Sequence, residues 1–324
     1  MTVQRKKLNK GALWLVLGGA FVLRLLLAAI TTGYSYDMGC FGAWAAKMAQ
    51  SGPAAFYSEG YFADYPPGYL YVLGAVGAVQ KIFGLDFDGA AFKMLLALVP
   101  AVCDCAAAWL VAQLGQRCLP DGRGVLCLTA FAALHPAALF DTAVWKQIDG
   151  AFTLPILLCF LLLETKNYLP AAIFYGIALS IKPQALLFGP VLAACFLAGI
   201  VLERDRLRAF GRCFAGAALA VLPVLAAGLP FFGLRGLLPG LLDKYAGTVS
   251  GYPYASVNAF NWLAALGGNW QSIYAPALGG ISWRTLGMLG LLLVTATMAF
   301  FAYRSAVRGR FSPLLLAGFY GAGV

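Results

Sequence analysis

Long apolar runs alternate with short polar connections along almost the whole chain. About nine of these runs are candidates for membrane spans: 11–31, 93–115, 124–141, 150–164, 168–181, 184–202, 209–229, 285–303 and 312–324. A helix needs roughly 20 apolar residues to cross the hydrocarbon core of a bilayer, and several of these runs lie near the lower limit. No run alternates as a barrel strand does, and helices satisfy their own backbone hydrogen bonds in lipid. The pattern therefore predicts an all-α, polytopic membrane protein.

A further apolar run, at 68–83, could cross the membrane or lie at its surface. If it does not cross, a set of basic residues shares the side of the basic N-terminal segment "QRKKLNK". That set is Arg117, Arg123, Lys166, Arg204, Arg206, Arg208, Arg212, Arg304, Arg308 and Arg310. The opposite side then holds only Lys146, Lys182, Arg235, Lys244 and Arg284. Because cytoplasmic loops carry the excess of Lys and Arg, we expect a cytoplasmic N-terminus and a run 68–83 that does not cross.

This arrangement predicts two long outer loops, at about 32–92 and 230–284, with interfacial helices in them. Two short outer turns lie between them, at 143–150 and 180–184, whereas the inner loops are short and basic. We expect one transmembrane domain over 1–324. The last apolar run ends without a polar flank, so we expect the chain to be the front part of a longer protein.

Composition supports the membrane assignment and excludes other classes. The chain is 61% hydrophobic and 11% charged, whereas a soluble domain carries about 25% charged residues. A net charge of +10 does not indicate nucleic-acid binding here, because the cations cluster between apolar runs. The first run, at 11–31, is too long for a signal peptide and is expected to be a retained span. Most of the eight cysteines lie inside spans, so no disulfide framework is expected.

Charged residues gather at the expected outer surface, close to the ends of spans. They are Asp37, Asp64, Asp141, Lys146, Asp149 and Lys182. Any one of them could be merely solvated, but several short turns return such groups to one level, which favours a site. Asp64 precedes Pro66 and Pro67, which stiffen the chain before a helix; alternatively, the two prolines only start that helix.

Two charges lie deeper in the apolar runs, Arg24 in the first and Asp104 in the second. Each would cost about 2.5–3.5 kcal/mol at the centre of the bilayer without a partner. We therefore predict a structural Arg24–Asp104 ion pair. The single histidine, His135, makes no metal site alone and is expected to be structural.

The second outer loop combines aromatic rings with amides, including Asn258, Asn261 and Trp262. Aromatic faces beside amides suit a sugar, which has apolar faces and hydroxyl edges. The rings alone would also suit an aromatic belt at the membrane interface.

These segments, taken in order, resemble the GT-C superfamily of polytopic glycosyltransferases. The similarity rests on "YSYDMG", "DYPPGYLY", "VWKQIDG", "SIKPQ" and "SVNAFNW". It extends to the dolichol-linked Alg glucosyltransferases and to bacterial polyprenyl-phosphate-mannose transferases. The resemblance implies that Asp37 is the catalytic base and that Lys182, beside Gln184, contacts the lipid phosphate. Asp37 is followed by Met38 where some members carry a second acid, which weakens the case for a metal there.

The resemblance implies transfer of a hexose, mannose or glucose, from a polyprenyl-phosphate donor to an acceptor hydroxyl, with inversion. The acceptor would be a glycan, a lipid-linked glycan or a protein, on the outer face of a bacterial cell membrane. Lys146 is a second candidate for the phosphate. The expected substrate contacts are Asp64, Tyr65, Gln147, Asp149, Gln184, Asn258, Asn261 and Trp262. No cofactor is expected, although a divalent metal stays open.

A transporter or flippase of lipid-linked sugars is the main alternative, and a non-catalytic membrane scaffold is a third. Transporters commonly carry internal repeats and binding groups at the midplane of the membrane. This sequence shows no repeat, and its ionisable groups gather at one face, which favours the transferase.

Overall fold

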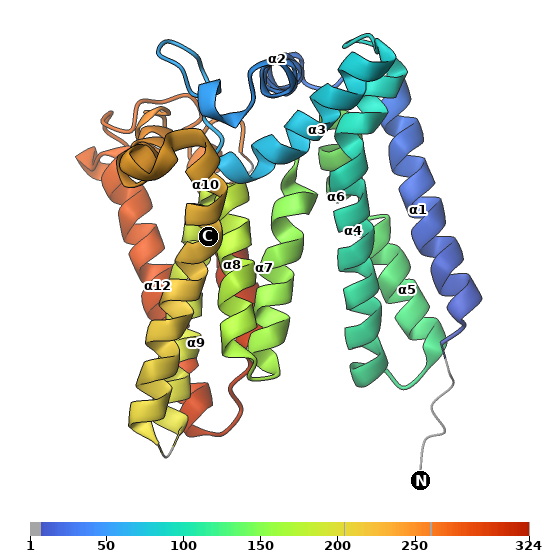
Figure 1. Ribbon diagram of the computed structural model, residues 1–324. Helices are drawn as coiled ribbons and strands as arrows, with labels where there is room; N and C mark the ends of the chain where they lie inside the picture. Colours follow the sequence, from blue (N-terminus) through green and yellow to red (C-terminus); the bar gives the residue numbers. More distant parts are fainter. Residues whose placement is uncertain (1–7, 204, 260, 324) are drawn as a thin grey trace. The chain divides into compact units, whose positions relative to one another are not determined.

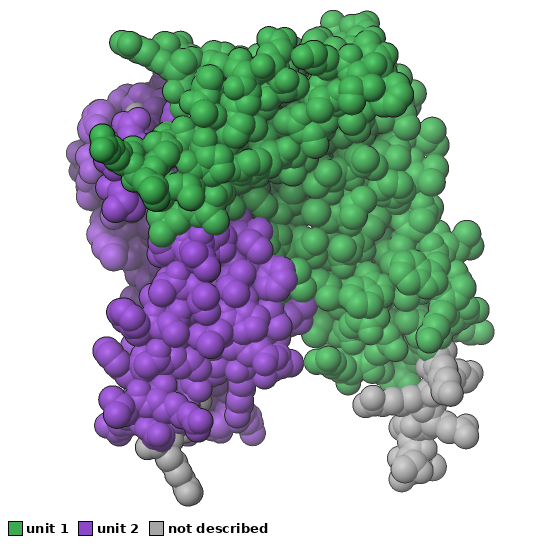
Figure 2. Space-filling model, viewed as in Figure 1, with its two compact units in different colours: residues 1–158, 180–182, 224–237 green, residues 159–179, 183–223, 238–324 purple. Residues whose placement is uncertain are grey.

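The computed structural model describes residues 8–203, 205–259 and 261–323. All regular structure in these residues is helical, and β-pairing is limited to isolated bridges such as Tyr254–Ser272. The chain divides into two compact units, drawn in different colours in Figure 2. Unit 1 holds residues 1–158, 180–182 and 224–237, and unit 2 holds residues 159–179, 183–223 and 238–324.

Unit 1 contains the elements that begin the chain. They are α1 (Lys10–Ile30), α2 (Ser35–Ser51), α3 (Pro67–Phe83), α4 (Ala90–Cys118), α5 (Gly122–Ala133), α6 (Pro136–Leu139), a π-helix (Phe140–Trp145) and the start of α7 (Asp149–Glu164). Helices α1 and α4 run in opposite directions, and α2 and α3 connect them at one end (Figure 1). This is the arrangement expected if the run 68–83 does not cross between them.

Helix α2 is an element that the sequence analysis did not identify within the first outer loop. It packs along α3 with its apolar face, which consists of Phe41, Trp44, Ala45 and Met48. The two helices approach so closely that a Cβ on Gly77 would lie 2.0 Å from the carbonyl oxygen of Ala45. Helix α3 begins as the prolines predict, with Pro66 as its N-cap and Pro67 as its first residue.

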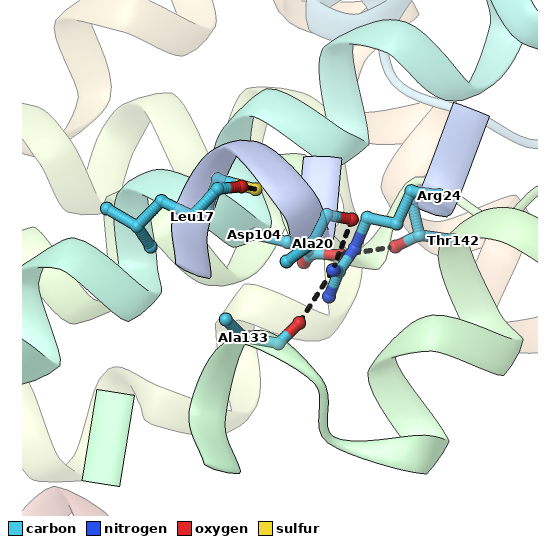
Figure 3. Close-up of polar contacts among 7 residues, drawn as sticks. Leu17, Ala20, Arg24, Asp104, Ala133 and Thr142 are labelled. Atoms are coloured by element: carbon cyan, nitrogen blue, oxygen red, sulfur yellow. Dashed lines mark hydrogen bonds and ion pairs between the residues drawn. The ribbon is translucent and has the colours of Figure 1, made fainter. Parts of the chain in front are cut away.

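The predicted Arg24–Asp104 ion pair is confirmed, with 3.0 Å between Arg24 Nε and Asp104 Oδ2 (Figure 3). Thr142 donates to the same carboxylate oxygen at 2.7 Å, and Arg24 Nη1 donates to the carbonyl of Ala133 at 2.6 Å. Arg24 is completely buried. A buried charge of this kind needs such partners, and here they join α1, α4 and the segment 122–145.

Unit 2 contains most of the remaining helices. They are α8 (Tyr168–Ile181), the 3₁₀-helix Pro183–Phe188, α9 (Gly189–Leu202), α10 (Arg206–Ser250), α11 (Trp262–Ala265), α12 (Trp283–Val307) and α13 (Pro313–Gly323). The boundary between the units falls within α7, α8 and α10.

Helix α10 differs from the span expected at 209–229, because it continues to Ser250. Gly233 interrupts it with a φ of 62°, a conformation that glycine adopts readily. The expected outer loop at 230–284 therefore begins as helix and becomes irregular only after Ser250. Asn261 and Ser282 then cap α11 and α12.

Within the residues that the structure describes, six helical segments are long and apolar enough to cross a membrane, which supports an integral membrane protein. They are Lys10–Ile30, Ala90–Cys118, Gly122–Trp145, Pro183–Val201, Arg206–Thr248 and Trp283–Val307. The other expected spans, at 150–164, 168–181 and 312–324, are occupied by the shorter helices α7, α8 and α13. The expected total of about nine spans thus exceeds the six that meet this length.

Candidate active site

Asp37 lies in the first turn of α2, near the N-terminal end of that helix. Its Oδ2 accepts two hydrogen bonds, one from Trp145 Nε1 at 2.9 Å and one from Gln147 Nε2 at 2.5 Å. The positive end of a helix dipole also favours a negative charge at this position. The structure thus joins two of the segments that the sequence analysis singled out, and it holds one carboxylate with two side-chain donors.

Trp145 is the functional candidate that sequence reasoning missed. It was noticed only as a member of "VWKQIDG", yet its indole N–H is one of the two donors to Asp37. Its ring centroid lies 5.3 Å from that of Tyr34, and its carbonyl accepts from Tyr34 N at 3.3 Å. A tryptophan beside charged and amide residues at a span end was a usable signal, because a buried indole N–H needs a partner.

Tyr65 extends the hydrogen-bonded chain, because its hydroxyl donates to Gln147 Oε1 at 3.3 Å. Its ring packs against Phe41 and Trp44, with centroid distances of 5.8 and 5.1 Å. Burial, followed by the nearby carboxylates Asp149, Asp64 and Asp37, raises the pKa of Tyr65. The phenol therefore stays neutral and acts as a hydrogen-bond donor.

Lys182 and Asp149 form an ion pair in the same unit. The Lys182 side chain is 12% exposed and that of Asp149 is 44% exposed. Lys182 Nζ lies 6.0 Å from the centroid of the Tyr65 ring, and Asp149 occupies the first turn of α7. An ammonium group is thereby held beside the Tyr65–Gln147–Asp37 chain, with one carboxylate as its partner.

Asp64 belongs to the same electrostatic environment. Burial raises the pKa of the Cys40 thiol, and the charges of Asp64 and Asp37 raise it further. Two carboxylates therefore act on one residue of α2.

Lys146 lies in the turn between Trp145 and Gln147. The residue is buried, with 2% of its surface exposed. Its Nζ donates to Thr31 Oγ1 and to the Ala143 carbonyl, both at 2.6 Å. Burial, with a smaller contribution from Lys93, lowers the pKa of Lys146 to about 8. Of the two lysines expected at the phosphate, Lys146 therefore bonds to a hydroxyl and a carbonyl of the protein, whereas Lys182 pairs with the carboxylate of Asp149.

The candidates of the second outer loop share a separate cavity in unit 2. Asn258, Asn261 and Trp262 line a hollow of about 710 Å³. The two asparagine amides also form hydrogen bonds within the loop. Asn261 Oδ1 caps α11 by accepting from Ala264 N at 2.9 Å, and Asn258 Oδ1 accepts from Trp270 Nε1 at 2.9 Å. Gln184, on the 3₁₀-helix Pro183–Phe188, is exposed. Three of the residues singled out in the sequence, Asn258, Asn261 and Trp262, thus lie around one hollow. Part of the hydrogen bonding of the two asparagines is structural.

The comparison with known families decides the class of protein. The family model of glycosyltransferase family 87 matches residues 62–323, which is most of the chain. The chain belongs to glycosyltransferase family 87. No curated protein sequence matches it. This family 87 protein is therefore a membrane glycosyltransferase.

The family 87 match covers only part of the site described above. Tyr65, Gln147, Asp149 and Lys182 lie within the matched residues, whereas Asp37 precedes them. The assignment to the family therefore does not depend on Asp37. Across 8–203, 205–259 and 261–323, no group of three or more His, Cys, Asp or Glu residues is arranged to hold a metal ion.

Proposed function

We propose that this family 87 protein transfers a hexose from a polyprenyl-phosphate-linked donor to an acceptor hydroxyl, by a single displacement at the outer face of the membrane. The observation that supports this proposal most directly is the carboxylate of Asp37, held by Trp145 and Gln147 in the unit that also holds Lys182. A sugar carried on a phosphate already has a leaving group. The protein then needs a base for the acceptor and a cation for the departing phosphate.

Asp37 is the proposed base. Trp145 and Gln147 both donate to Oδ2, so Oδ1 is the oxygen assigned to the proton of the acceptor hydroxyl. As that proton transfers to Asp37, the acceptor oxygen forms a bond to the anomeric carbon. The bond from that carbon to the phosphate oxygen breaks, and the phosphate leaves with the electron pair. Attack from the opposite face inverts the anomeric centre.

Lys182 is the proposed contact for the donor phosphate. In the structure its ammonium pairs with Asp149, which a phosphate oxygen would replace or share. A lysine binds phosphate as a point charge with three donors, so it needs no fixed plane of approach. Asp64, Tyr65, Asp149 and Gln147 are the proposed sugar or acceptor contacts in unit 1. Gln184, Asn258, Asn261 and Trp262 are proposed for the same purpose in unit 2.

The test of this function uses the full-length protein in proteoliposomes, with radiolabelled polyprenyl-phosphate mannose and polyprenyl-phosphate glucose. A membrane extract supplies the acceptor, and parallel reactions contain Mg²⁺ or a chelator. We expect label from one donor to appear on an acceptor, with the anomeric configuration opposite to that of the donor. Labelled donor that changes leaflet without transfer would instead indicate a flippase. Transfer from nucleotide sugars alone would contradict the proposed donor class.

A further inference from the structure

We propose that Lys146 is a positioning residue for the base, so that its buried side chain holds Trp145 and Gln147 in the orientation that presents their N–H groups to Asp37. This inference rests on the proposed function, in which Asp37 removes the acceptor proton. It assigns Lys146 a different role from the sequence-based expectation, in which this lysine contacts the donor phosphate.

The backbone of Lys146 is the first observation. Its φ is 73°, in the left-handed region, and it forms the C-cap of the π-helix Phe140–Trp145. For a residue other than glycine this conformation is unfavourable, so surrounding contacts must hold it. With this backbone conformation, the side chains of Trp145 and Gln147 both donate to Asp37. The Lys146 side chain instead donates to Thr31.

The anchor of the Lys146 side chain is the second observation. Thr31 directly follows α1, and its hydroxyl accepts from Lys146 Nζ at 2.6 Å and donates to the Leu27 carbonyl at 2.6 Å. Lys146 Nζ also donates to the Ala143 carbonyl at 2.6 Å. Because Thr31 is the C-cap of α1 and Ala143 lies in the π-helix, the ammonium connects the turn to two elements at once.

The approach of α2 to the same turn is the third observation. A Cβ on Gly33, whose φ is 80°, would lie 3.0 Å from Lys146 Cγ and 2.7 Å from Met38 Cγ. The glycine therefore allows the start of α2 to pass against the stem of the lysine. Tyr34 N then donates to the Trp145 carbonyl at 3.3 Å. The placement of Asp37 relative to its two donors thus depends on contacts that run through Lys146.

The first arm of the test measures transfer kinetics of Lys146→Met, which keeps the stem and removes the ammonium. Misplacement of a catalytic group by about 1 Å can cost on the order of 100-fold in rate. We expect kcat to fall about 100-fold, while the donor KM stays within about twofold of wild type, since phosphate binding is left intact. Lys166→Met is the matched control, because Lys166 is also left-handed, with a φ of 62°, and is exposed.

A second pair of variants covers the case in which Lys146→Met does not fold. Thr31→Val removes the hydroxyl that accepts from the lysine, whereas Thr31→Ser keeps it. We expect Thr31→Val to lower kcat and Thr31→Ser to retain it. Thr165→Val is the control, since Thr165 is exposed and its hydroxyl bonds to carbonyls of α7 and to Asn167 Nδ2.

A spectroscopic arm separates this inference from the proposed function. The protein is labelled with 5-fluorotryptophan, and the Trp145 signal in the ¹⁹F NMR spectrum is assigned with Trp145→Phe. We expect Lys146→Met and Thr31→Val to shift or broaden the Trp145 signal, and Lys166→Met to leave it unchanged. If Asp37→Asn retains full activity, the proposed base is wrong, while the shift of the Trp145 signal still reports on the positioning.

Two results would overturn the inference. An increase in donor KM at unchanged kcat in Lys146→Met would show that the lysine binds the phosphate after all. Unchanged kcat and an unchanged Trp145 signal, in Lys146→Met or in Thr31→Val, would show that the turn keeps its orientation without the lysine.

Discussion

The ionisable amine of Lys146 belongs to a buried residue. Its three hydrogen-bond acceptors are the Thr31 hydroxyl and the carbonyls of Ala143 and Val144, but burial and Lys93 disfavour its charged form. The sequence singled out this residue within "VWKQIDG". It could not show which way the side chain turns, because that depends on the left-handed backbone at this residue and on a contact with Thr31, over 100 positions away.

The lowered pKa of Lys146 gives a prediction about stability. In the folded protein the amine loses its proton near pH 8, whereas in the unfolded chain it does so near pH 10.4. Between these values the unfolded state binds more protons, so stability rises with pH. We expect the Tm of the wild type, relative to that of Lys146→Met, to increase from pH 7.5 to pH 9.5 in detergent. A constant or falling difference would contradict the assigned shift.

At the scale of elements, helix α2 was missed although its pattern was present. Phe41, Trp44, Ala45 and Met48 repeat at the spacing of one helix face. The segment begins without a side-chain cap and contains Gly39 and Gly42, which lower intrinsic helix propensity. Packing on α3 supplies the missing stability. Helix α10 shows the opposite case: the expected span ended at 229, yet the helix continues past Pro230, Gly233 and Gly236 to Ser250.

The close approach of α2 and α3 is tested with Gly77→Ala. The new Cβ would lie 2.0 Å from the Ala45 carbonyl oxygen, so α2 must move away from α3. Overpacking of this kind costs about 1–3 kcal/mol, and we expect a lower Tm together with reduced transfer, because α2 carries Asp37.

Gly39→Ala is the matched control for that variant. A Cβ there meets nothing within 4 Å, and alanine favours a helix by about 1 kcal/mol over glycine. We expect its Tm to hold or rise. An equal effect of the two substitutions would show that the helices are not in tight contact at Gly77.

For the whole molecule, composition and charge distribution were enough to predict an all-helical membrane protein and the pairing of Arg24 with Asp104. The length of the apolar runs predicts the membrane-spanning helices. The cost of an isolated charge in lipid predicts the ion pair. The additional partners of the pair, Thr142 and the Ala133 carbonyl, could not be predicted. They come from a segment whose path depends on how α5, α6 and the π-helix succeed one another.

The buried pair is tested by a double-mutant cycle with Arg24→Ala and Asp104→Ala. Removing one partner leaves an uncompensated buried charge, which costs about 3–5 kcal/mol. We expect each single variant to lower the free energy of unfolding, measured by detergent titration, and the double variant to cost less than the two together. Arg117→Ala serves as control, because Arg117 lies at an exposed position of α4, the helix that carries Asp104. Full stability of both single variants and of the double variant would exclude a structural role for the pair.

The claim that Asp37 is the base of the transfer reaction is tested most directly by the kcat of Asp37→Asn in proteoliposomes. Asparagine keeps the shape of the side chain and an oxygen for Trp145 and Gln147 but cannot take the proton. We expect kcat to fall by about 10²–10⁴-fold, with unchanged folding, while Asp88→Asn, at an exposed position of the segment between α1 and α4, transfers normally. Transfer by Asp37→Asn at the wild-type rate would contradict the claim and move the search for the base to Asp64 and Asp149.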